Sequence, residues 1–453
     1  MKASIPQGTR DFSPLEMKRR TYMFSVLKKA FRLYGFDQIE TPSFENASTL
    51  LGKYGDEGDR LIFKILNNGD FLKKADQQFL DEKNSKKLTK QICDRALRYD
   101  LTVPFARYVV QHRNDITMPF KRFQIQNVWR ADRPQKGRYR EFYQCDADVI
   151  GSTALQHEVE LIQLYDAVFS EFNLLTVIKI NNRKVLSAIA ELANISDRLT
   201  EFTVILDKLD KIGKSGVVEQ LNKNEFPTFA IQYIEKFLDL EGDNATMLSA
   251  LSTLISDSEI GKKGLEELQE VVSQVEKFGL DSAKLQLDFT LARGLDYYTG
   301  TILEVLSLEY ELGSIGGGGR YDDLTSMFGQ KELSGVGISF GFDRIYLIMN
   351  ELNKFPDLQE ASVQLCFMNF GTEEAQKAMG YLKHLRKANI SAELYPKSIK
   401  MNKQMKYANQ KQIPYVALLG EDEMAENKIL VKHMESGTQD LLSIEQLIEK
   451  LAN

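Results

Sequence analysis

The stretch from Lys121 to Arg140 concentrates positive charge in a chain that is acidic overall. It contains the proline and glycine of a chain reversal, at Pro134 and Gly137, and should therefore fold as a hairpin loop. Against one acid, Asp132, it holds seven basic residues: Lys121, Arg122, Arg130, Arg133, Lys136, Arg138 and Arg140. Guanidinium groups bind phosphate through paired hydrogen bonds, so the loop is a candidate phosphate site. A basic, solvated hairpin tip is the alternative, because charge clusters are common on protein surfaces.

The strand-like segment that follows carries a row of polar side chains. Side chains alternate between the two faces of a β-strand, so Gln144, Asp146 and Asp148 should share one face. Such a row could form the floor of a substrate pocket. A solvated outer sheet face is the alternative, because antiparallel sheets often have one side in water.

Two glycine-containing segments further along the chain could also approach a ligand. In LARGLDYYTG, Arg293 precedes Gly294 between two strand-like runs, where it could bind a phosphate or carboxylate or occupy a surface hairpin. In GSIGGGGRYDDL, four consecutive glycines would let the backbone approach a ligand closely. A tight turn would require them equally, and the segment lacks the G-K-[ST] ending of a P-loop.

The segment GVGISFGFDRI joins a strand of small residues to a helix whose first turn carries Arg344. Helix N-termini favour anions, and a guanidinium there would strengthen a nucleotide site. An ion-paired surface arginine is the alternative.

A framework of strands and helices must position these segments. Apolar spacing predicts a helix over 15–34, before the strand-like FDQIETPSFE, and another over about 153–172. Strands are predicted over 120–129 and 140–150, and again from residue 284 onwards. The polar, lysine-rich residues 66–91 are typical of a solvated insertion. Residues 185–280 have a charged helical pattern, which indicates a helical domain inserted in a β-rich one.

The pattern changes after Pro356, where strands and helices alternate. This alternation predicts a small domain with a largely parallel sheet. Within it, Lys400, Lys403 and Lys406 have helical spacing. They could face RNA phosphates, or they could belong to a lysine-rich solvated helix.

The composition narrows the class of protein. The chain has 453 residues, 43% of them hydrophobic, which is enough for two or three domains. Its formal charge of −6 argues against indiscriminate coating of nucleic acid but permits local basic patches. Three widely spaced cysteines disfavour a disulfide framework or a structural zinc site. The chain has no long apolar run for crossing a membrane and no signal-like start, so we expect a cytoplasmic protein.

Taken in order, these segments resemble the signatures of the class II aminoacyl-tRNA synthetases. FDQIETPSFE resembles motif 1, with Pro42 at a dimer interface, and residues 120–151 resemble motif 2. GVGISFGFDRI resembles motif 3. The segments LARGLDYYTG and GSIGGGGRYDDL are similar to the two signatures that distinguish the histidyl-tRNA synthetase family. The resemblance covers nearly the whole chain.

The resemblance implies an α+β fold. An antiparallel β-sheet catalytic domain flanked by helices would occupy residues 1–352, interrupted by the helical insertion at 185–280. A C-terminal α/β anticodon-binding domain would occupy residues 358–453. Members of the family act as homodimers, and the same is expected here.

The resemblance also implies roles for individual residues. For ATP it implies Arg130 at the α-phosphate, Arg344 at the far end of the nucleotide, and Arg138 and Arg140 from the same motif as Arg130. For histidine it implies Asp100, Thr102 and Gln144 near the α-amino group, Asp148 and Tyr298 near the imidazole, and Tyr297 as a further histidine-binding residue. Arg293 would lie at the reacting carboxylate and α-phosphate. The candidate contacts to tRNA are Arg133, Gln135, Lys400, Lys403 and Lys406.

The implied chemistry is the two-step charging of tRNA(His) with L-histidine. ATP first activates the histidine carboxylate, with Mg²⁺ accompanying the nucleotide, and the histidyl group then passes to the 3′ end of the tRNA. Arginines should dominate the first step, with Arg130 and Arg293 as the catalytic pair, because it needs positioning and charge neutralisation more than proton transfer.

Two departures and two alternatives accompany the resemblance. Many bacterial members of the family carry Glu where this chain has Asp100 and Asp148, whereas the loop RPQKGRYR has a bacterial form. One alternative is a catalytically silent relative that regulates ATP phosphoribosyltransferase. This relative generally lacks the C-terminal domain. The other is a class II synthetase for a different amino acid, which would lack LARGLDYYTG.

Overall fold

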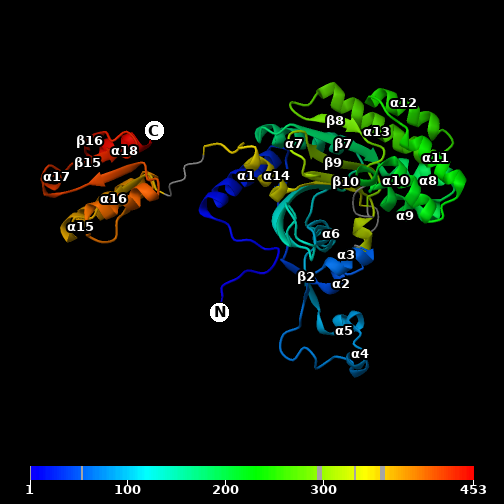
Figure 1. Cartoon of the computed structure of the whole chain (residues 1–453), viewed down its shortest axis with the longest axis horizontal. Coiled ribbons are helices and arrows are strands. Elements are labelled where there is room, and N and C mark those ends of the chain that lie inside the picture. Colours follow the sequence, from blue (N-terminus) through cyan, green and yellow to red (C-terminus); the bar gives the residue numbers. More distant parts are fainter. Residues whose placement is uncertain (1, 53–54, 293–297, 331–332, 358–362, 453) are drawn as a thin grey trace. The chain divides into compact units, whose positions relative to one another are not determined.

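The computed structural model describes residues 2–52, 55–292, 298–330, 333–357 and 363–452. The chain divides into two compact units, residues 1–355 and residues 356–453 (Figure 1). No helix in the described ranges is long and apolar enough to cross a membrane.

An eight-stranded sheet forms the centre of the first unit, in the order β1-β5-β6-β11-β10-β9-β7-β8. The six inner strands are antiparallel, and the outermost pairs, β1 with β5 and β7 with β8, are parallel. The strands are β1 (Asp37–Gln38), β5 (Phe120–Trp129), β6 (Glu141–Ile150), β7 (Thr176–Asn182), β8 (Lys284–Leu287), β9 (Thr301–Ser307), β10 (Gly316–Tyr321) and β11 (Gly335–Phe340).

Three helices cover one face of this sheet: α1 (Pro14–Leu33), α7 (Gln156–Glu171) and α14 (Phe342–Glu351). They share one core with the sheet, to which β6 contributes Cys145, Ala147 and Val149. Helix α1 begins with a capping box, in which Ser13 and Glu16 satisfy each other's backbone N–H groups. The predicted helix at 15–34 and strand at 120–129 are confirmed, and the predicted strand at 140–150 begins one residue later, at Glu141.

The four consecutive glycines lie inside a central strand, so the tight-turn alternative is wrong. Strand β10 pairs with β11 along its length and with β9 through its four glycines. A Cβ atom on Gly318 would lie 2.2 Å from the Gly337 carbonyl oxygen, and one on Gly319 would lie 2.6 Å from the Thr301 carbonyl oxygen. These glycines are therefore required by the close approach of neighbouring backbone, and not by a chain reversal.

A small antiparallel sheet, β2-β4-β3, lies in the same unit, made of β2 (Phe44–Asn46), β3 (Lys64–Ile65) and β4 (Arg95–Leu97). Its neighbours are α2 (Ala47–Leu50), α3 (Gly55–Leu61) and α6 (Thr102–Gln111). The predicted polar excursion follows β3 and contains α4 (Gln77–Asp81) and α5 (Ser85–Ile92), neither of which has a buried residue. It projects from the unit, as a solvated insertion would (Figure 1).

Residues 183–278 form only helices, which gather beside β7 and β8 (Figure 1). The α-helices are α8 (Arg183–Leu192), α9 (Leu199–Leu206), α10 (Leu209–Lys223), α11 (Thr228–Leu238), α12 (Asn244–Leu254) and α13 (Glu259–Phe278). Helix α13 contacts α7, α8 and β7. The buried side chains of these helices are continuous with the core under the sheet.

The second unit is a five-stranded sheet, β13-β12-β14-β15-β16, with helices. Its elements are β12 (Leu365–Phe367), α15 (Thr372–Lys387), β13 (Ala392–Leu394), α16 (Met401–Gln410), β14 (Tyr415–Leu418), α17 (Glu421–Ala425), β15 (Ile429–His433), β16 (Gln439–Leu442) and α18 (Ile444–Ala452). Strands β13, β12 and β14 are parallel, as predicted, but β15 pairs with β14 in the antiparallel sense after the short helix α17, and β16 forms an antiparallel hairpin with β15.

Candidate active site

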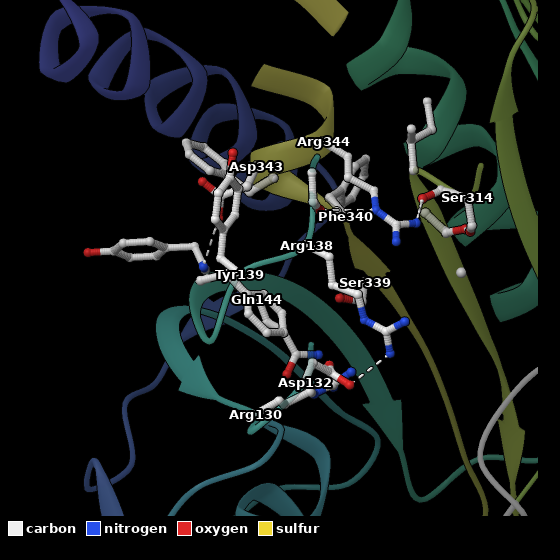
Figure 2. A pocket seen from close by; sticks show the side chains of 18 residues that line it. Arg130, Asp132, Arg138, Tyr139, Gln144, Ser314, Ser339, Phe340, Asp343 and Arg344 are labelled. Carbon is white, nitrogen blue, oxygen red and sulfur yellow. Dashed lines mark hydrogen bonds and ion pairs between the residues drawn. The ribbon is translucent and has the colours of Figure 1, made fainter. Parts of the chain in front are cut away.

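The larger of two adjoining pockets is a cavity of about 380 Å³. It is lined by the β5–β6 loop with the start of β6, by residues 314–317 leading into β10, and by the junction of β11 with α14 (Figure 2). Three of the segments that the sequence singled out therefore meet at one place, although they are far apart in the chain.

Two arginines of the β5–β6 region line this pocket. Arg130, directly after β5, donates from Nε to the Tyr99 carbonyl oxygen at 3.0 Å, and its guanidinium lies 4.2 Å from the centre of the Tyr99 ring. Arg138 is about half exposed and forms an ion pair with the buried Asp132 at 2.9 Å. Arg130 is thus held by backbone and ring, whereas Arg138 is held by a carboxylate.

Arg344, in the first turn of α14, reaches the pocket from the opposite side (Figure 2). It donates to the carbonyl oxygens of Ser314 at 2.6 Å and Gly137 at 3.3 Å. Both of these acceptors are backbone oxygens, which hold the guanidinium at the wall of the pocket.

Asp343, beside Arg344 in α14, anchors this end of the pocket. Its carboxylate accepts hydrogen bonds from Arg10 at 2.6 Å, from the buried Arg20 at 2.7 Å and from the backbone N–H of Tyr143 at 3.3 Å. It thereby links the N-terminal segment, helix α1 and strand β6 to the first turn of α14.

The other predicted residues of the β5–β6 loop do not line the larger pocket. Arg140 points away from it, towards the N-terminal segment, and donates to the carbonyl oxygens of Asp132 at 3.1 Å and Gln7 at 3.4 Å. Arg133 and Gln135 are exposed at the tip of the loop. The basic residues of this loop therefore have three different surroundings: Arg138 lines the pocket, Arg140 packs against the N-terminal segment, and Arg133 faces solvent.

The smaller pocket, of about 90 Å³, adjoins the larger one and extends along the polar face of β6. Gln144, Asp146 and Asp148 line it together, as the alternation of the strand predicted. Four residues line both pockets: Arg130, Gln144, Gly317 and Ser339. The predicted substrate floor is therefore a pocket wall, and not a solvated face.

Asp148 is enclosed by two side chains. The Tyr321 hydroxyl donates to Oδ1 at 2.7 Å, and the guanidinium of the fully buried Arg122 forms an ion pair with Oδ2 at 2.9 Å, without the alignment of a hydrogen bond. Arg122 also lies 4.1 Å from the centre of the Phe105 ring. Burial raises the pKa of Asp148, while Arg122 and the Tyr321 hydroxyl lower it.

Asp146 lies between Gln144 and Asp148 and is 2% exposed. Burial raises the pKa of this carboxyl to about 7, with a smaller contribution from Asp148, and against the effect of Arg122 and of a hydrogen bond from Ser339. Its Oδ1 atom is buried without a hydrogen-bond partner, as is Oε1 of Gln144.

The remaining predicted histidine-site residues come from two segments. Asp100 is buried and caps the start of α6 by accepting from the Val103 N–H at 3.2 Å, and Thr102 is the first residue of that helix. Both line the smaller pocket, as does Tyr298. Arg293 and Tyr297 lie outside the described residues.

Several residues at this site had no predicted role. Asp146 was on the predicted polar face, but it was not assigned to a ligand. Arg122 lies opposite Asp148 in the β5–β6 register, so a predicted hairpin with its register would have identified the pair. Tyr321 and Ser339 required the pairing of β6, β11 and β10, for which no local signal exists.

Gly317 is the glycine of β10 that faces the ligand space. A Cβ atom there would meet only the Leu303 carbonyl oxygen, at 3.4 Å, and Gly317 lines both pockets. Gly337 on β11 is different, because its Cβ atom would lie 2.0 Å from Oδ1 of Asp148. The absence of side chains on these strands leaves room for the ligand at one position and for a buried carboxylate at the other.

In the second unit, Lys400, Lys403 and Lys406 lie at the start and along the exposed side of α16. They are all exposed, so they are available to a phosphate backbone, although a solvated helix would show the same pattern.

The two pockets offer complementary chemistry. The larger one is lined by Arg130, Arg138 and Arg344, and so it suits a polyanion such as a nucleotide. The smaller one has buried carboxylates and an amide, which suit a ligand rich in hydrogen-bond donors. Among the described residues, no group of three His, Cys, Asp or Glu side chains could hold a metal ion.

Comparison with known families agrees with this arrangement. The family described as "Histidyl-tRNA synthetase" matches residues 8–345, and the one described as "Anticodon binding domain" matches residues 363–453. The histidine–tRNA ligase of Christiangramia forsetii is 58% identical over 448 residues, which cover 98% of each chain. That of Bacteroides fragilis strain YCH46 is 53% identical and covers 99% of each chain.

Solved structures extend the comparison to the fold. The crystal structure of histidyl-tRNA synthetase from Nostoc sp. PCC 7120 superposes with a TM-score of 0.82 at 30% identity, covering 100% of this chain and 99% of the other. It confirms the predicted α+β fold with a C-terminal α/β unit. An ATP phosphoribosyltransferase regulatory subunit/histidyl-tRNA synthetase from Bacillus halodurans C has a TM-score of 0.73 at 22% identity, which shows the fold alone; the match covers 92% of this chain and 98% of that one.

Proposed function

Because the chain belongs to the histidyl-tRNA synthetase family, we propose that its larger pocket binds ATP and its smaller pocket binds histidine. The chain is a histidine–tRNA ligase, a class II enzyme that uses ATP. The observation that carries the assignment of the pockets is their junction: Arg130 and Gln144 line both, so that two ligands bound there would meet at these side chains.

In the proposed first step, a histidine carboxylate oxygen attacks the α-phosphorus of ATP. A bond forms between this oxygen and phosphorus, the bond from phosphorus to the bridging oxygen breaks, and pyrophosphate leaves with the bonding electrons. Both reactants are anionic, so a cation between them lowers the barrier. Arg130 lies at the junction, and by resemblance Arg293 would act with it as the second catalytic arginine.

The remaining ATP contacts come from the arginines of the larger pocket. Arg344 would bind the far end of the nucleotide, since it lines the larger pocket and backbone oxygens hold its guanidinium there. Arg138 would contact the phosphates after exchanging its ion pair with Asp132 for them. We assign Arg140 the different task of fixing the loop to the N-terminal segment, because its guanidinium points there.

For histidine, we propose that Asp100, Thr102 and Gln144 surround the α-amino group, and that Asp148 and Tyr298 face the imidazole, with Tyr297 in the same site. The lining of the smaller pocket supports this assignment, because it includes Asp100, Thr102, Gln144, Asp148 and Tyr298. A site built on hydrogen bonds rejects amino acids that would leave its buried groups unpaired, which accounts for selectivity without an editing step.

In the second step, a terminal hydroxyl of tRNA(His) attacks the activated carbonyl and AMP leaves. The exposed Arg133 and Gln135 would contact the acceptor end. Lys400, Lys403 and Lys406 would contact the anticodon region from α16. We therefore propose a catalytic domain over 1–352, with the helices at 185–280 as its insertion, and an anticodon-binding domain over 358–453.

Further features of the proposal concern the metal, the assembly and the compartment. Since the described residues contain no cluster for a metal ion, Mg²⁺ would arrive with ATP, held mainly by phosphate oxygens, and would supply additional charge neutralisation there. Pro42 and Phe44 are exposed in the segment that resembles motif 1, which supports a homodimer through that segment. The site of action would be the cytoplasm.

The experiment for this proposal is amino-acid-dependent ATP–pyrophosphate exchange without tRNA, across the twenty standard amino acids. Histidine alone should support exchange. Exchange with another amino acid would favour a different synthetase specificity. Absence of exchange from a folded protein that still binds histidine would favour the regulatory relative.

A further inference from the structure

One carboxylate of the smaller pocket, that of Asp146, has no role in the binding of histidine proposed above. Both oxygens of Asp148 already have protein partners, Tyr321 on Oδ1 and Arg122 on Oδ2. Asp146, the next residue with the same orientation on β6, has a buried Oδ1 atom without any hydrogen-bond partner. A buried acceptor without a partner is costly unless a ligand supplies the missing donor.

We infer that Asp146 is a substrate-binding residue, whose Oδ1 atom accepts a hydrogen bond from the α-ammonium group of bound histidine. This inference rests on the proposed use of the smaller pocket for histidine. It adds a charged acceptor beside Gln144, whose Oε1 atom is also buried without a partner.

The position of Asp146 along the strand selects the ammonium group over the imidazole. Gln144 lines both pockets, whereas Asp146 and Asp148 line only the smaller one. Successive side chains on one strand face are about 7 Å apart, so Gln144, Asp146 and Asp148 form a series leading away from the junction. The reacting carboxylate must lie at the junction. The α-nitrogen is attached to the carbon next to it, and it therefore lies near the first two members of the series.

The charges of the pocket lead to the same choice. The buried cation Arg122 forms its ion pair with Asp148, and Arg130 lies at the junction, where the substrate carboxylate would be. Of the groups already placed near the ammonium, Thr102 and Gln144 are neutral, and Asp100 also accepts from the Val103 N–H. Asp146 can supply a second carboxylate, because a ligand cation at hydrogen-bonding distance favours the ionised form of a carboxyl group.

Binding of three related ligands distinguishes the proposed contact from a general role of Asp146 in folding. L-Histidine has an ammonium, a carboxylate and an imidazole; L-histidinol lacks the carboxylate; 3-(imidazol-4-yl)propanoate lacks the ammonium. Binding of each to the full chain would be measured by isothermal titration calorimetry, for the unaltered protein and for Asp146→Asn, which preserves the size of the side chain.

We expect Asp146→Asn to weaken histidine and histidinol about 10- to 100-fold, as for loss of a charge-assisted hydrogen bond, and imidazolylpropanoate less than about threefold. Tyr298→Phe is the matched control on the proposed imidazole side and should weaken all three ligands by a similar factor. If Asp146→Asn does not fold, Asp146→Ala provides the same comparison at a smaller side chain.

Three results would overturn the inference. An equal loss for all three ligands would place Asp146 at the imidazole or give it only a structural role, and an unchanged affinity for all three would remove it from the site. In both cases the proposed function would stand, because the unaltered protein still binds histidine. If the unaltered protein bound none of the ligands, the histidine assignment would fail together with this inference.

Discussion

The two pockets share a wall but differ in the sign and the burial of the charged side chains that line them. In the larger pocket the arginines are partly exposed, and backbone oxygens accept hydrogen bonds from Arg130 and Arg344. In the smaller pocket the acids are almost fully buried, and Asp148 is enclosed by Arg122 and Tyr321. Exposed cations cost the protein little and bind many anions. Buried acids are costly in free energy but discriminate between ligands.

This difference fits the ligands proposed for the two sites. A nucleotide carries several negative charges, so a few arginines can attract and orient it. Histidine differs from other amino acids mainly in the hydrogen-bonding groups of its ring, and only buried, oriented partners can read these. We therefore expect substitutions in the larger pocket to affect mainly the rate of adenylate formation and the use of ATP. Substitutions in the smaller pocket should affect mainly the binding and selection of histidine.

The largest effect is expected at the junction. Arg130→Ala removes the described cation that both pockets share, and should lower kcat for adenylate formation about 10²- to 10³-fold, as for loss of one preorganised donor to developing charge. Single-turnover measurement of pyrophosphate release would test this. Arg133→Ala, on the exposed side of the same loop, is the control and should change the rate less than about twofold. A loss below about tenfold for Arg130→Ala would contradict the shared role.

The second effect concerns the free energy of unfolding of the protein, which depends on the ionisation of Asp146 in the smaller pocket. The pKa of Asp146 is raised to about 7, against 3.8 for an unperturbed carboxyl. Below about pH 4 the group is protonated in both folded and unfolded chains and contributes nothing. As the pH rises from 4 to 7 the unfolded chain ionises first, so the folded state loses stability, and above pH 7 the full penalty applies.

Asp146→Asn removes this penalty. We expect the variant to gain on the order of 2 kcal/mol over the unaltered protein at pH 8 without ligand, and less at pH 5, because the ionised carboxyl is absent. Thermal or urea unfolding at the two pH values measures the difference. Asp132→Asn in the larger pocket is the control: it loses the ion pair with Arg138 and should not gain stability at pH 8. A gain for Asp146→Asn that does not grow with pH would contradict the raised pKa.

The smallest effect is expected at the far end of the larger pocket. Arg344→Ala should raise KM for ATP about tenfold, because one charge contact to the nucleotide is lost, and should leave KM for histidine within about twofold. Pyrophosphate exchange at varied ATP and varied histidine gives both constants. An equal rise in the two would show that Arg344 supports the sheet as a whole, and the contrast between the pockets would weaken.

Much of the site was predictable because its signals are local. The alternation of β6 placed Gln144, Asp146 and Asp148 on one face, and the apolar pattern of residues 15–34 predicted α1. The contacts of Arg140 were not predictable, because the loop sequence does not say which of its arginines faces the pocket. That depends on the N-terminal segment, whose Gln7 carbonyl oxygen accepts from Arg140.

The sequence by itself determined many of the elements, the polar face of β6 and the family, since these depend on local periodicity and on motif residues in a fixed order. Only the tertiary structure decided which acid of β6 has its charge balanced by the protein and which has an oxygen left over. That outcome depends on the register that sets Arg122 opposite Asp148, and on β10 bringing Tyr321 to the same carboxylate. Ion pairs and hydrogen bonds act over a few ångströms, and only strand pairing brings residues so far apart in the chain to that distance.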